Sequence, residues 1–287
     1  MNNRPFQRRL RGAATPLRIA AAVFVLLVVV GALLAPWIAP APPLAQNIPD
    51  RLQSFVSNGH LLGTDEFGRD VVSRLIYGAR VELAIAIGST VVALAIGASL
   101  GLIGAYIGGW AEMVSMRAVE ALLAFPPIVL AMLVVTIYGS GQLTLIAVLG
   151  LVFAPTFARL TFAQTLAVKS AEYVEAARAF SAGTPTILVK VILPNIAGAL
   201  VAQFPITLAN AILLESGLSY LGLGITPPTP SWGGMVASGQ RFMSVDPTLL
   251  IVASATIALT VLSFGLIGDG VRDVLDPRER KGVTHVQ

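Results

Sequence analysis

Few side chains in this sequence could do ion or proton chemistry inside a membrane helix. Glu120, Arg159, Glu215 and Asp269 lie near the ends of long apolar runs, so each of them can reach an aqueous interface. A carrier driven by protons or sodium usually keeps a titratable or ion-coordinating cluster near the middle of the membrane. The sequence shows no such cluster and no evident inverted repeat. It therefore resembles a conduit whose energy comes from another polypeptide.

Residue patterns of the common enzyme classes are also absent from the sequence. The chain has no cysteine, and its two histidines, His60 and His285, belong to no H-E-x-x-H zinc motif. It contains no G-x-x-x-x-G-K-[ST] phosphate-binding loop. We therefore predict a non-catalytic chain with no metal site and no cofactor of its own.

The most informative polar segment lies between two apolar spans and reads YVEAARAFSAGTPTILVKVILPN from Tyr173 to Asn195. At 100° per residue, a helix would place Tyr173, Ala176, Ala177 and Phe180 on one narrow face. Two alanines on that face would let another surface approach closely. The alternative is an ordinary loop helix that lies on its own bundle.

The same segment carries signals for a turn and a second helix. Gly183 can end the first helix in a left-handed conformation. Thr184 can then cap a second helix that has Pro185 at its first position.

The composition indicates a polytopic membrane protein. Hydrophobic residues make up 55% of the 287 residues, charged residues only 12%, and the mean hydropathy is +0.80. We attribute the net charge of +4 and the pI near 9.8 to basic cytoplasmic loops rather than to nucleic-acid binding. About 20 apolar residues are needed to cross a bilayer core. Six segments qualify: Ile19–Ala39, Leu83–Ile103, Ala118–Tyr138, Leu143–Ala163, Ile196–Leu214 and Thr248–Gly268.

The first of these spans has a competing interpretation as a secretory signal peptide. Five arginines precede it and an Ala-Pro-rich stretch follows it. Because the apolar run from Ile19 to Ala35 is longer than a typical signal core, we expect an uncleaved helix. The intact mass of the purified chain distinguishes the two.

The distribution of basic residues predicts the orientation of the chain. With the N-terminus inside, 14 of the 19 basic residues fall in cytoplasmic segments and 5 in outer segments. This asymmetry favours an even number of spans with both termini in the cytoplasm.

We therefore expect one membrane domain with two sizeable outer segments. The first should end in an interfacial helix that leads into the second span. The second is too polar and too rich in glycine and proline to span, and could be a re-entrant or a surface loop. Trp37 and Trp232 suit the membrane interface. The expected parts are a cytoplasmic segment 1–18, a first span 19–39, an outer segment 40–82, a core 83–270 that includes a loop 169–194 and an outer loop 219–247, and a cytoplasmic tail 271–287.

Small residues recur at intervals of four along the second span. They are Ala93, Gly97, Gly101, Ala105 and Gly109. Such a row lets a second helix approach closely. It could serve the translocation pathway or a subunit interface, but packing within the chain is the interpretation we favour.

The residues Glu175-Ala176-Ala177, then Gly183, then Ile192-Leu193-Pro194 resemble the EAA…G…I-LP signature of permease subunits of bacterial ABC importers. Further segments resemble one subgroup, the dipeptide, oligopeptide and nickel importers of DppC/OppC type. The resemblance covers about residues 15–280. The segments that carry it are His60–Leu83, Arg117–Pro126, Leu218–Met235 and Gly268–Arg278.

This resemblance implies the permease fold of type I ABC importers, an all-α membrane domain of six spans with a cytoplasmic coupling helix. That helix would dock on an ATPase subunit, where Glu175 would pair, the alanines would permit close contact and Gly183 would allow the turn. The residues it assigns to coupling are Glu172, Tyr173, Glu175, Ala176, Ala177, Arg178, Phe180, Gly183 and Pro194.

The resemblance also implies partners and a location. It predicts a multi-pass protein of the bacterial inner membrane, paired with a homologous permease and with two cytoplasmic ATPase subunits that bind ATP and magnesium. An extracytoplasmic solute-binding protein would deliver the substrate. The outer loops either contact this protein or form structural lids. The residues expected at that contact are Pro227, Pro228, Ser231, Trp232 and Gly233.

The leading functional hypothesis is the permease of an importer for di- or oligopeptides. Nickel chelates, glutathione and opines are alternatives within the same machinery. A stand-alone channel or secondary carrier is an alternative from another class, and passive or ion-driven flux through the chain alone would favour it. No acid, base and nucleophile come together to support an intramembrane enzyme.

Overall fold

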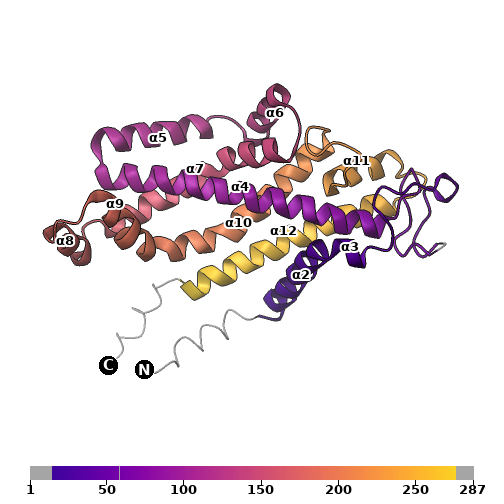
Figure 1. Ribbon diagram of the computed structural model, residues 1–287, viewed down its shortest axis with the longest axis horizontal. Helices are drawn as coiled ribbons and strands as arrows, with labels where there is room; N and C mark the ends of the chain where they lie inside the picture. Colours follow the sequence, from indigo (N-terminus) through magenta and orange to yellow (C-terminus); the bar gives the residue numbers. More distant parts are fainter. Residues whose placement is uncertain (1–14, 58, 276–287) are drawn as a thin grey trace.

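The computed structural model describes residues 15–57 and 59–275 as an elongated bundle of helices (Figure 1). Residues 1–14 of the expected cytoplasmic segment 1–18 and residues 276–287 of the expected tail 271–287 lie outside the described residues, with seven of the basic residues that predicted the orientation (4, 8, 9, 11, 278, 280 and 281). The elements in chain order are α2 (Pro16–Leu33), α3 (Ala35–Ile38), η1 (Ile48–Asp50), α4 (Val71–Ile107), α5 (Gly109–Leu123), α6 (Pro127–Tyr138), α7 (Gln142–Val168), α8 (Glu172–Ala179), α9 (Thr184–Thr186), the π-helical η2 (Ile187–Ile192), α10 (Leu193–Tyr220), α11 (Trp232–Arg241) and α12 (Thr248–Leu275).

The second span is part of a much longer helix than the sequence suggested. With 37 residues, α4 is about 55 Å long at about 1.5 Å per residue. Asp70 begins it by accepting a hydrogen bond from the Ser73 backbone N–H at 2.7 Å. The stretch expected to lead into the second span from the interface, Val71 to Glu82, is continuous with that span and forms the first three turns of α4.

The third span is broken rather than continuous. The expected helix Ala118–Tyr138 divides into α5 and α6, whose axes differ by 88°. Pro127 cannot donate a backbone hydrogen bond and starts α6, while Pro126 before it is in a non-helical conformation. In the described part of the chain, five helices are long and apolar enough to cross a membrane, or six if this bent pair is one span.

The tightest packing in the bundle joins α4 to α7. A Cβ atom added at Gly97 would lie 2.3 Å from the Ala154 carbonyl oxygen, and one added at Gly101 would lie 2.5 Å from the Ala158 carbonyl oxygen. The predicted row of small residues thus packs within the chain at these positions, and Ala93 and Ala105 of the row are also fully buried. Gly109 does not belong to it, because α4 ends at Ile107.

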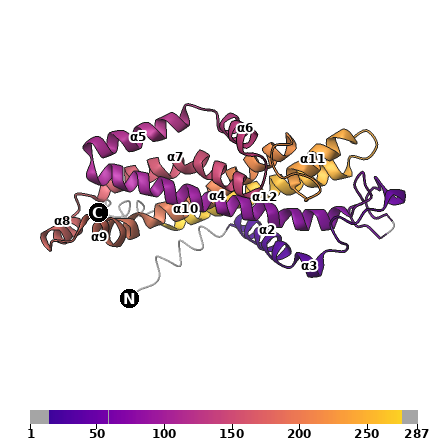
Figure 2. The same ribbon diagram turned by 45° about the horizontal axis from the view of Figure 1, so that its top comes forward.

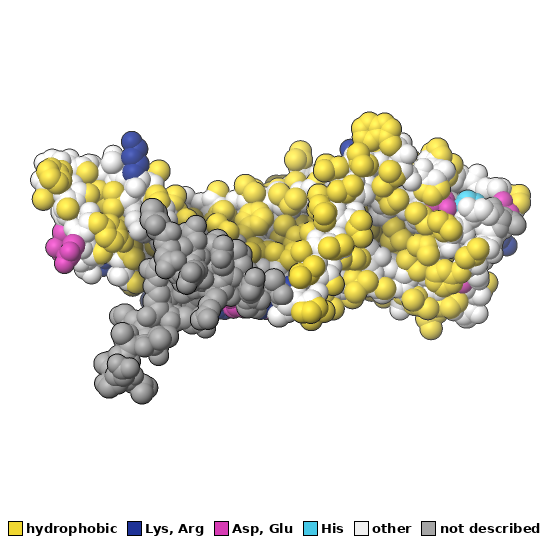
Figure 3. Space-filling model, turned by 90° about the horizontal axis from the view of Figure 1, so that it is seen from below, with side chains coloured by type: hydrophobic (Ala, Val, Ile, Leu, Met, Phe, Trp, Pro, Cys, Tyr) yellow, Lys and Arg dark blue, Asp and Glu magenta, His cyan; other side chains and the backbone are white. Residues whose placement is uncertain are grey.

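The other helices surround this pair. The views in Figures 1 and 2 show α5 running back along the outside of α4, and α12 lying beside α2. Hydrophobic side chains cover much of the middle of the surface in Figure 3, whereas acidic and basic side chains are more frequent toward its two ends. This is the surface expected of a bundle that spans a membrane.

We predict that Gly97→Ala destabilises the folded chain by about 1–3 kcal/mol, because the added methyl group overlaps the α7 backbone. The matched control is Gly265→Ala on α12, where no other atom lies within 4 Å of the new Cβ. The control should be neutral or more stable by up to about 1 kcal/mol. Thermal unfolding of the purified variants in detergent checks this, and equal stability of the two variants would refute the packing.

Candidate functional site

The predicted coupling segment lies at one extreme of the molecule. Figures 1 and 2 place α8 and α9 at the left end, while α11 and the loops of the segment 40–70 lie at the right end. α8 follows α7 directly and is followed by α9, η2 and α10. The segment is therefore a protrusion between two membrane-length helices.

One side of α8 is anchored to the bundle and the other is free. Val174 is fully buried, and Ala177 packs against the same hydrophobic cluster as Ile187 and Ile192. Tyr173 is 41% exposed and Phe180 87% exposed. The helical wheel placed Tyr173, Ala176, Ala177 and Phe180 on one face. It could not tell that Ala177, at one edge of this face, turns toward the bundle.

This arrangement corrects the predicted docking face. Ala177 belongs to the anchored side, so the face open to a partner consists of Tyr173, Ala176 and Phe180. A charge at Ala177 would disturb the folding of this loop rather than its docking. Glu172 and Glu175 are exposed in the first turn, where the helix dipole favours carboxylates.

The turn after α8 also differs from the prediction. The left-handed residue is Ser181, with φ +59°, whereas Gly183 is extended with φ −66°. The Ser181 N–H donates to the Arg178 carbonyl at 2.9 Å and the Ala182 N–H to the Ala177 carbonyl at 3.1 Å. These are the two hydrogen bonds of a Schellman motif.

Gly183 instead precedes α9 as its N-cap residue. Thr184 is the first residue of α9 and not its cap, and Pro185 is the second. Pro194 is exposed at the start of α10, directly after the π-helical η2, within one continuous helical run from Thr184 to Tyr220.

Two cationic side chains tie the predicted coupling segment to the C-terminal end of α4. The Lys169 ammonium group donates to the Ala105 carbonyl at 3.1 Å, which is one of the last carbonyls of α4. The Arg178 guanidinium lies 5.0 Å from the centre of the Tyr106 ring, and its Nε donates to the Tyr106 hydroxyl at 3.2 Å. These contacts join residues more than sixty positions apart, and no local pattern in the sequence indicated them.

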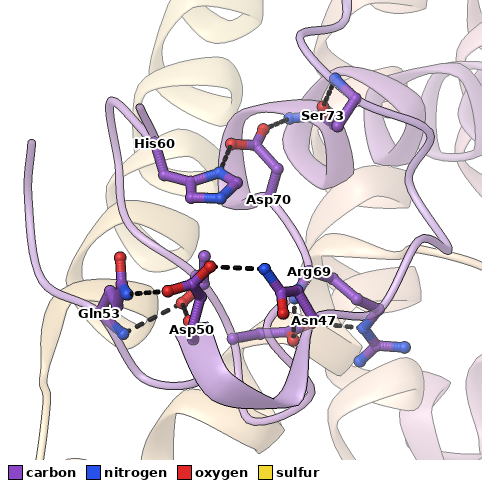
Figure 4. A network of polar contacts seen from close by, with 10 residues as sticks. Asn47, Asp50, Gln53, His60, Arg69, Asp70 and Ser73 are labelled. Carbon is purple, nitrogen blue, oxygen red and sulfur yellow. Dashed lines mark hydrogen bonds and ion pairs between the residues drawn. The ribbon is translucent and has the colours of Figure 1, made fainter. Parts of the chain in front are cut away.

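At the opposite end, the segment 40–70 is folded by a network of short polar contacts (Figure 4). His60 Nδ1 lies 2.8 Å from Asp70 Oδ2, and the other oxygen of Asp70 caps α4. Asp50 accepts from the Asn47 amide at 2.5 Å and from the Gln53 amide at 2.7 Å. The network fixes this segment over the outer end of α4.

Buried ion pairs support the same region. Asp65 Oδ2 lies 2.6 Å from Arg69 Nε and 3.3 Å from Arg74 Nε. A hollow of about 900 Å3 opens between this cluster and the loop before α11, with Pro228 and Arg241 also in its lining. The outer end is thus a folded cap with a recess.

The structure changes the role of the outer loop 219–247. Pro227 and Pro228 are exposed, as a contact with another protein requires. Ser231, Trp232 and Gly233 are buried, so the expectation that they form such a contact was wrong. Trp232 is 1% exposed, so its ring is not available to a membrane interface, whereas Trp37 is 78% exposed.

Each of these three buried residues has a packing function. Ser231 caps α11 by accepting a hydrogen bond from the Gly234 N–H at 3.2 Å. The Trp232 indole N–H donates to the Leu75 carbonyl of α4 at 3.0 Å. A Cβ atom at Gly233 would lie 2.1 Å from the Ser216 carbonyl oxygen. The Ser-Trp-Gly sequence therefore attaches α11 to α4 and α10.

Two acidic residues that sequence reasoning misjudged lie at this junction. Glu215 was expected to reach an interface and Glu82 was assigned to an outer segment, yet both are fully buried. The other three candidates, Glu120, Arg159 and Asp269, are exposed. Glu82 lies one helical turn from Gly78 and one from Ala86, which are both small. This spacing could have indicated from the sequence that Glu82 is on the buried face of the helix.

Comparison with known proteins identifies the class to which this architecture belongs. The family described as "Binding-protein-dependent transport system inner membrane component" matches residues 93–281. The chain belongs to this family, and it is a multi-pass inner-membrane permease subunit of an ABC importer of the DppC/OppC type.

Two relatives that match this chain over most of its length are also named as permease subunits. The glutathione transport system permease protein GsiD of Pectobacterium atrosepticum is 41% identical over 260 residues, which cover 91% of this chain and 86% of the relative. The protein of the same name from Escherichia coli O1:K1 is 39% identical over 273 residues, or 95% of this chain and 89% of the relative.

A solved structure supports the fold. A chain of the MetNI methionine ABC transporter, described in inward-facing conformations, superposes with a TM-score of 0.58 at 21% identity. The match covers 70% of this chain and 96% of that chain. The core helices thus have the fold of an importer permease.

We predict different effects for substitutions at the two turn positions after α8. Ser181→Gly should stabilise the fold by about 1 kcal/mol, because glycine adopts the left-handed conformation without strain. Gly183→Ala should be neutral within about 0.5 kcal/mol, because its backbone is extended and the nearest atom lies 3.9 Å from the new Cβ. Thermal unfolding tests both, and a severe loss in Gly183→Ala would contradict the assigned turn.

Proposed function

We propose that this chain forms, with a homologous permease, the pathway through which a short peptide enters the cell. ATP and magnesium would bind to two separate cytoplasmic ATPase subunits, and a solute-binding protein would deliver the substrate on the outer side. α8 would then face the cytoplasm, as would both termini. The observation that carries the proposal is the free face of α8 at the end of a membrane bundle.

The geometry of that face supports docking. Tyr173 and Phe180 expose aromatic surface on either side of the small Ala176, while Val174 holds the helix on the bundle. Burial of a few hundred Å2 contributes several kcal/mol, at about 25 cal/mol per Å2 before ordering costs. The exposed Glu175 can orient the contact by pairing with a cation or an N–H group on the partner.

The names of the relatives support the proposed substrate class. Two of them are named as glutathione permeases. Glutathione is one of the alternatives to di- and oligopeptides that the sequence left open, and it is itself a tripeptide. We propose short peptides as the substrate class, with glutathione as the first member to test.

Contact with the binding protein is proposed for the exposed rim of the outer end. Pro227 and Pro228 project from the loop before α11, next to the recess lined by Arg69 and Arg241. Proline costs little conformational entropy when it is immobilised, which suits a contact that forms and breaks in each cycle.

The assembled importer tests the substrate class. Proteoliposomes with both permeases, both ATPases and the binding protein should accumulate labelled glutathione only when ATP is present. An excess of unlabelled dipeptide should reduce this uptake if short peptides form the substrate class. Uptake of a nickel chelate or an opine in place of any peptide would overturn the substrate assignment. Flux through this chain alone, without an ATPase, would overturn the importer mechanism.

We predict that Ala176→Asp lowers ATP-driven uptake at least tenfold, because docking would bury an unpaired carboxylate. Ala176→Ser is the matched control, since it adds a small polar group without charge and should retain most of the uptake. Ala176 is exposed, so neither change should alter the folding of the chain. Co-purification of the ATPase with each variant is the second readout. Full uptake and full ATPase binding in Ala176→Asp would place the docking surface elsewhere.

A further inference from the structure

Two glutamates that take no part in the proposed coupling lie side by side in the outer half of the molecule. Glu82 belongs to α4 and Glu215 to α10, and each side chain is fully shielded from solvent. The two helices meet at this point, since the hydroxyl of Ser216, the residue next to Glu215, lies 3.5 Å from Glu82 Oε1, and the two carboxyl groups act directly on each other. The start of α11 closes the site from the third side.

The protein supplies donors for only half of the oxygen atoms in this pair. Glu82 Oε1 accepts from the Trp232 backbone N–H at 3.3 Å and from the Ser216 hydroxyl at 3.5 Å. Glu215 Oε1 accepts from the Ser219 hydroxyl at 2.6 Å. The Oε2 atoms of both glutamates are buried without a donor from the described part of the chain. A buried carboxyl oxygen without a partner is costly, so this pair requires a further hydrogen atom.

No cation can take that role among the residues described here. The charged group that acts on Glu82 is Glu215 itself. Arg80 on α4 is exposed, and Arg241 lies at the opposite end of α11 from Trp232 and is also exposed. Two ionised carboxylates in contact, shielded from water and without a cation, repel each other strongly.

We propose that Glu82 and Glu215 form a proton-binding site, in which one shared proton joins α4 to α10. A carboxyl group donates a hydrogen bond only when it is protonated, so a single proton between the two groups satisfies both. The remaining negative charge lies beside the N-terminal end of α11, where the helix dipole is favourable to it. The shared proton joins α4 to α10, and the negative charge attracts the N-terminal end of α11 to the same point.

Because of this site, the separation of α4 from α10 is coupled to the release of a proton. If α4 moves away from α10, water reaches both carboxyl groups and the shared proton is released. A groove of about 520 Å3 along α10, α11 and α12 includes Ser216 and Gly233 in its lining, so water needs to move only a short distance. A lower pH therefore favours the joined arrangement and a higher pH favours its separation.

Infrared spectroscopy of the full chain purified in detergent tests the site directly. At pH 7.5 exposed carboxyl groups are ionised, so the carbonyl stretch of a protonated carboxyl group reports a buried one. We expect this band in the wild type and in the control variant Glu120→Gln, which removes an exposed carboxyl group. The band should be absent from both Glu82→Gln and Glu215→Gln, because the introduced amide donates the hydrogen bond that the proton supplied.

Two results would overturn the proposal. One is a wild-type spectrum without a protonated carboxyl band at pH 7.5. The other is a band of full intensity in both glutamine variants. The wild-type spectrum tests the proposal even if a variant fails to fold. The band of a protonated carboxyl group must shift in D2O and disappear on alkaline titration. Neither measurement involves an ATPase or a transported substrate, so its outcome is independent of the proposed function.

The pH dependence of stability provides the second measurement. The folded chain holds one proton that the unfolded chain, with both carboxyl groups ionised, does not hold between about pH 6 and 9. Raising the pH should therefore increase the unfolding constant of the wild type up to tenfold per pH unit relative to Glu215→Gln. Identical pH profiles for the two proteins would contradict a shared proton.

Discussion

The close contact between α4 and α7 is the constraint on which the rest of the structure depends. Gly97 and Gly101 bring the two backbones so near that a methyl group at either position would overlap a carbonyl oxygen. From this contact α4 continues without a break in both directions. Its N-terminal end, on the side proposed to be outer, carries Asp70 and Glu82, and its C-terminal end, on the side proposed to be cytoplasmic, carries Tyr106. One helix thus holds the outer cap and the coupling segment at a fixed separation.

The two ends of α4 meet neighbours of different chemistry. Lys169 and Arg178 bind its C-terminal end through a carbonyl oxygen and an aromatic ring, and these polar contacts add to the packing of Val174 and Ala177 in holding α8 on the bundle. At the outer end, α10 and α11 pack on α4 through buried groups, including the indole of Trp232. A force applied to α8 would therefore act on a long stiff helix whose far end is held by buried contacts. That is the arrangement a permease needs if its motion is driven by an ATPase.

The sequence predicts most of the helices because long apolar runs allow few other structures in a membrane. It also locates the coupling segment, since a polar amphipathic stretch between two spans stands out. It does not predict the break at Pro126 and Pro127, because a proline inside a helix can either kink it or end it. Nor does it predict which residues of α8 turn inward, or that Glu82 and Trp232 are buried together, because these depend on contacts between helices distant in the sequence.

The most direct test of the central claim uses the absence of cysteine from the chain. A cysteine placed at Ala176 would be the only thiol in this subunit. In the assembled importer, a short thiol-directed cross-linker should join it to an ATPase subunit. The same treatment should leave Val174→Cys unreacted, because that position is buried. Labelling of the Ala176 cysteine by an impermeant reagent added outside intact cells would contradict the account.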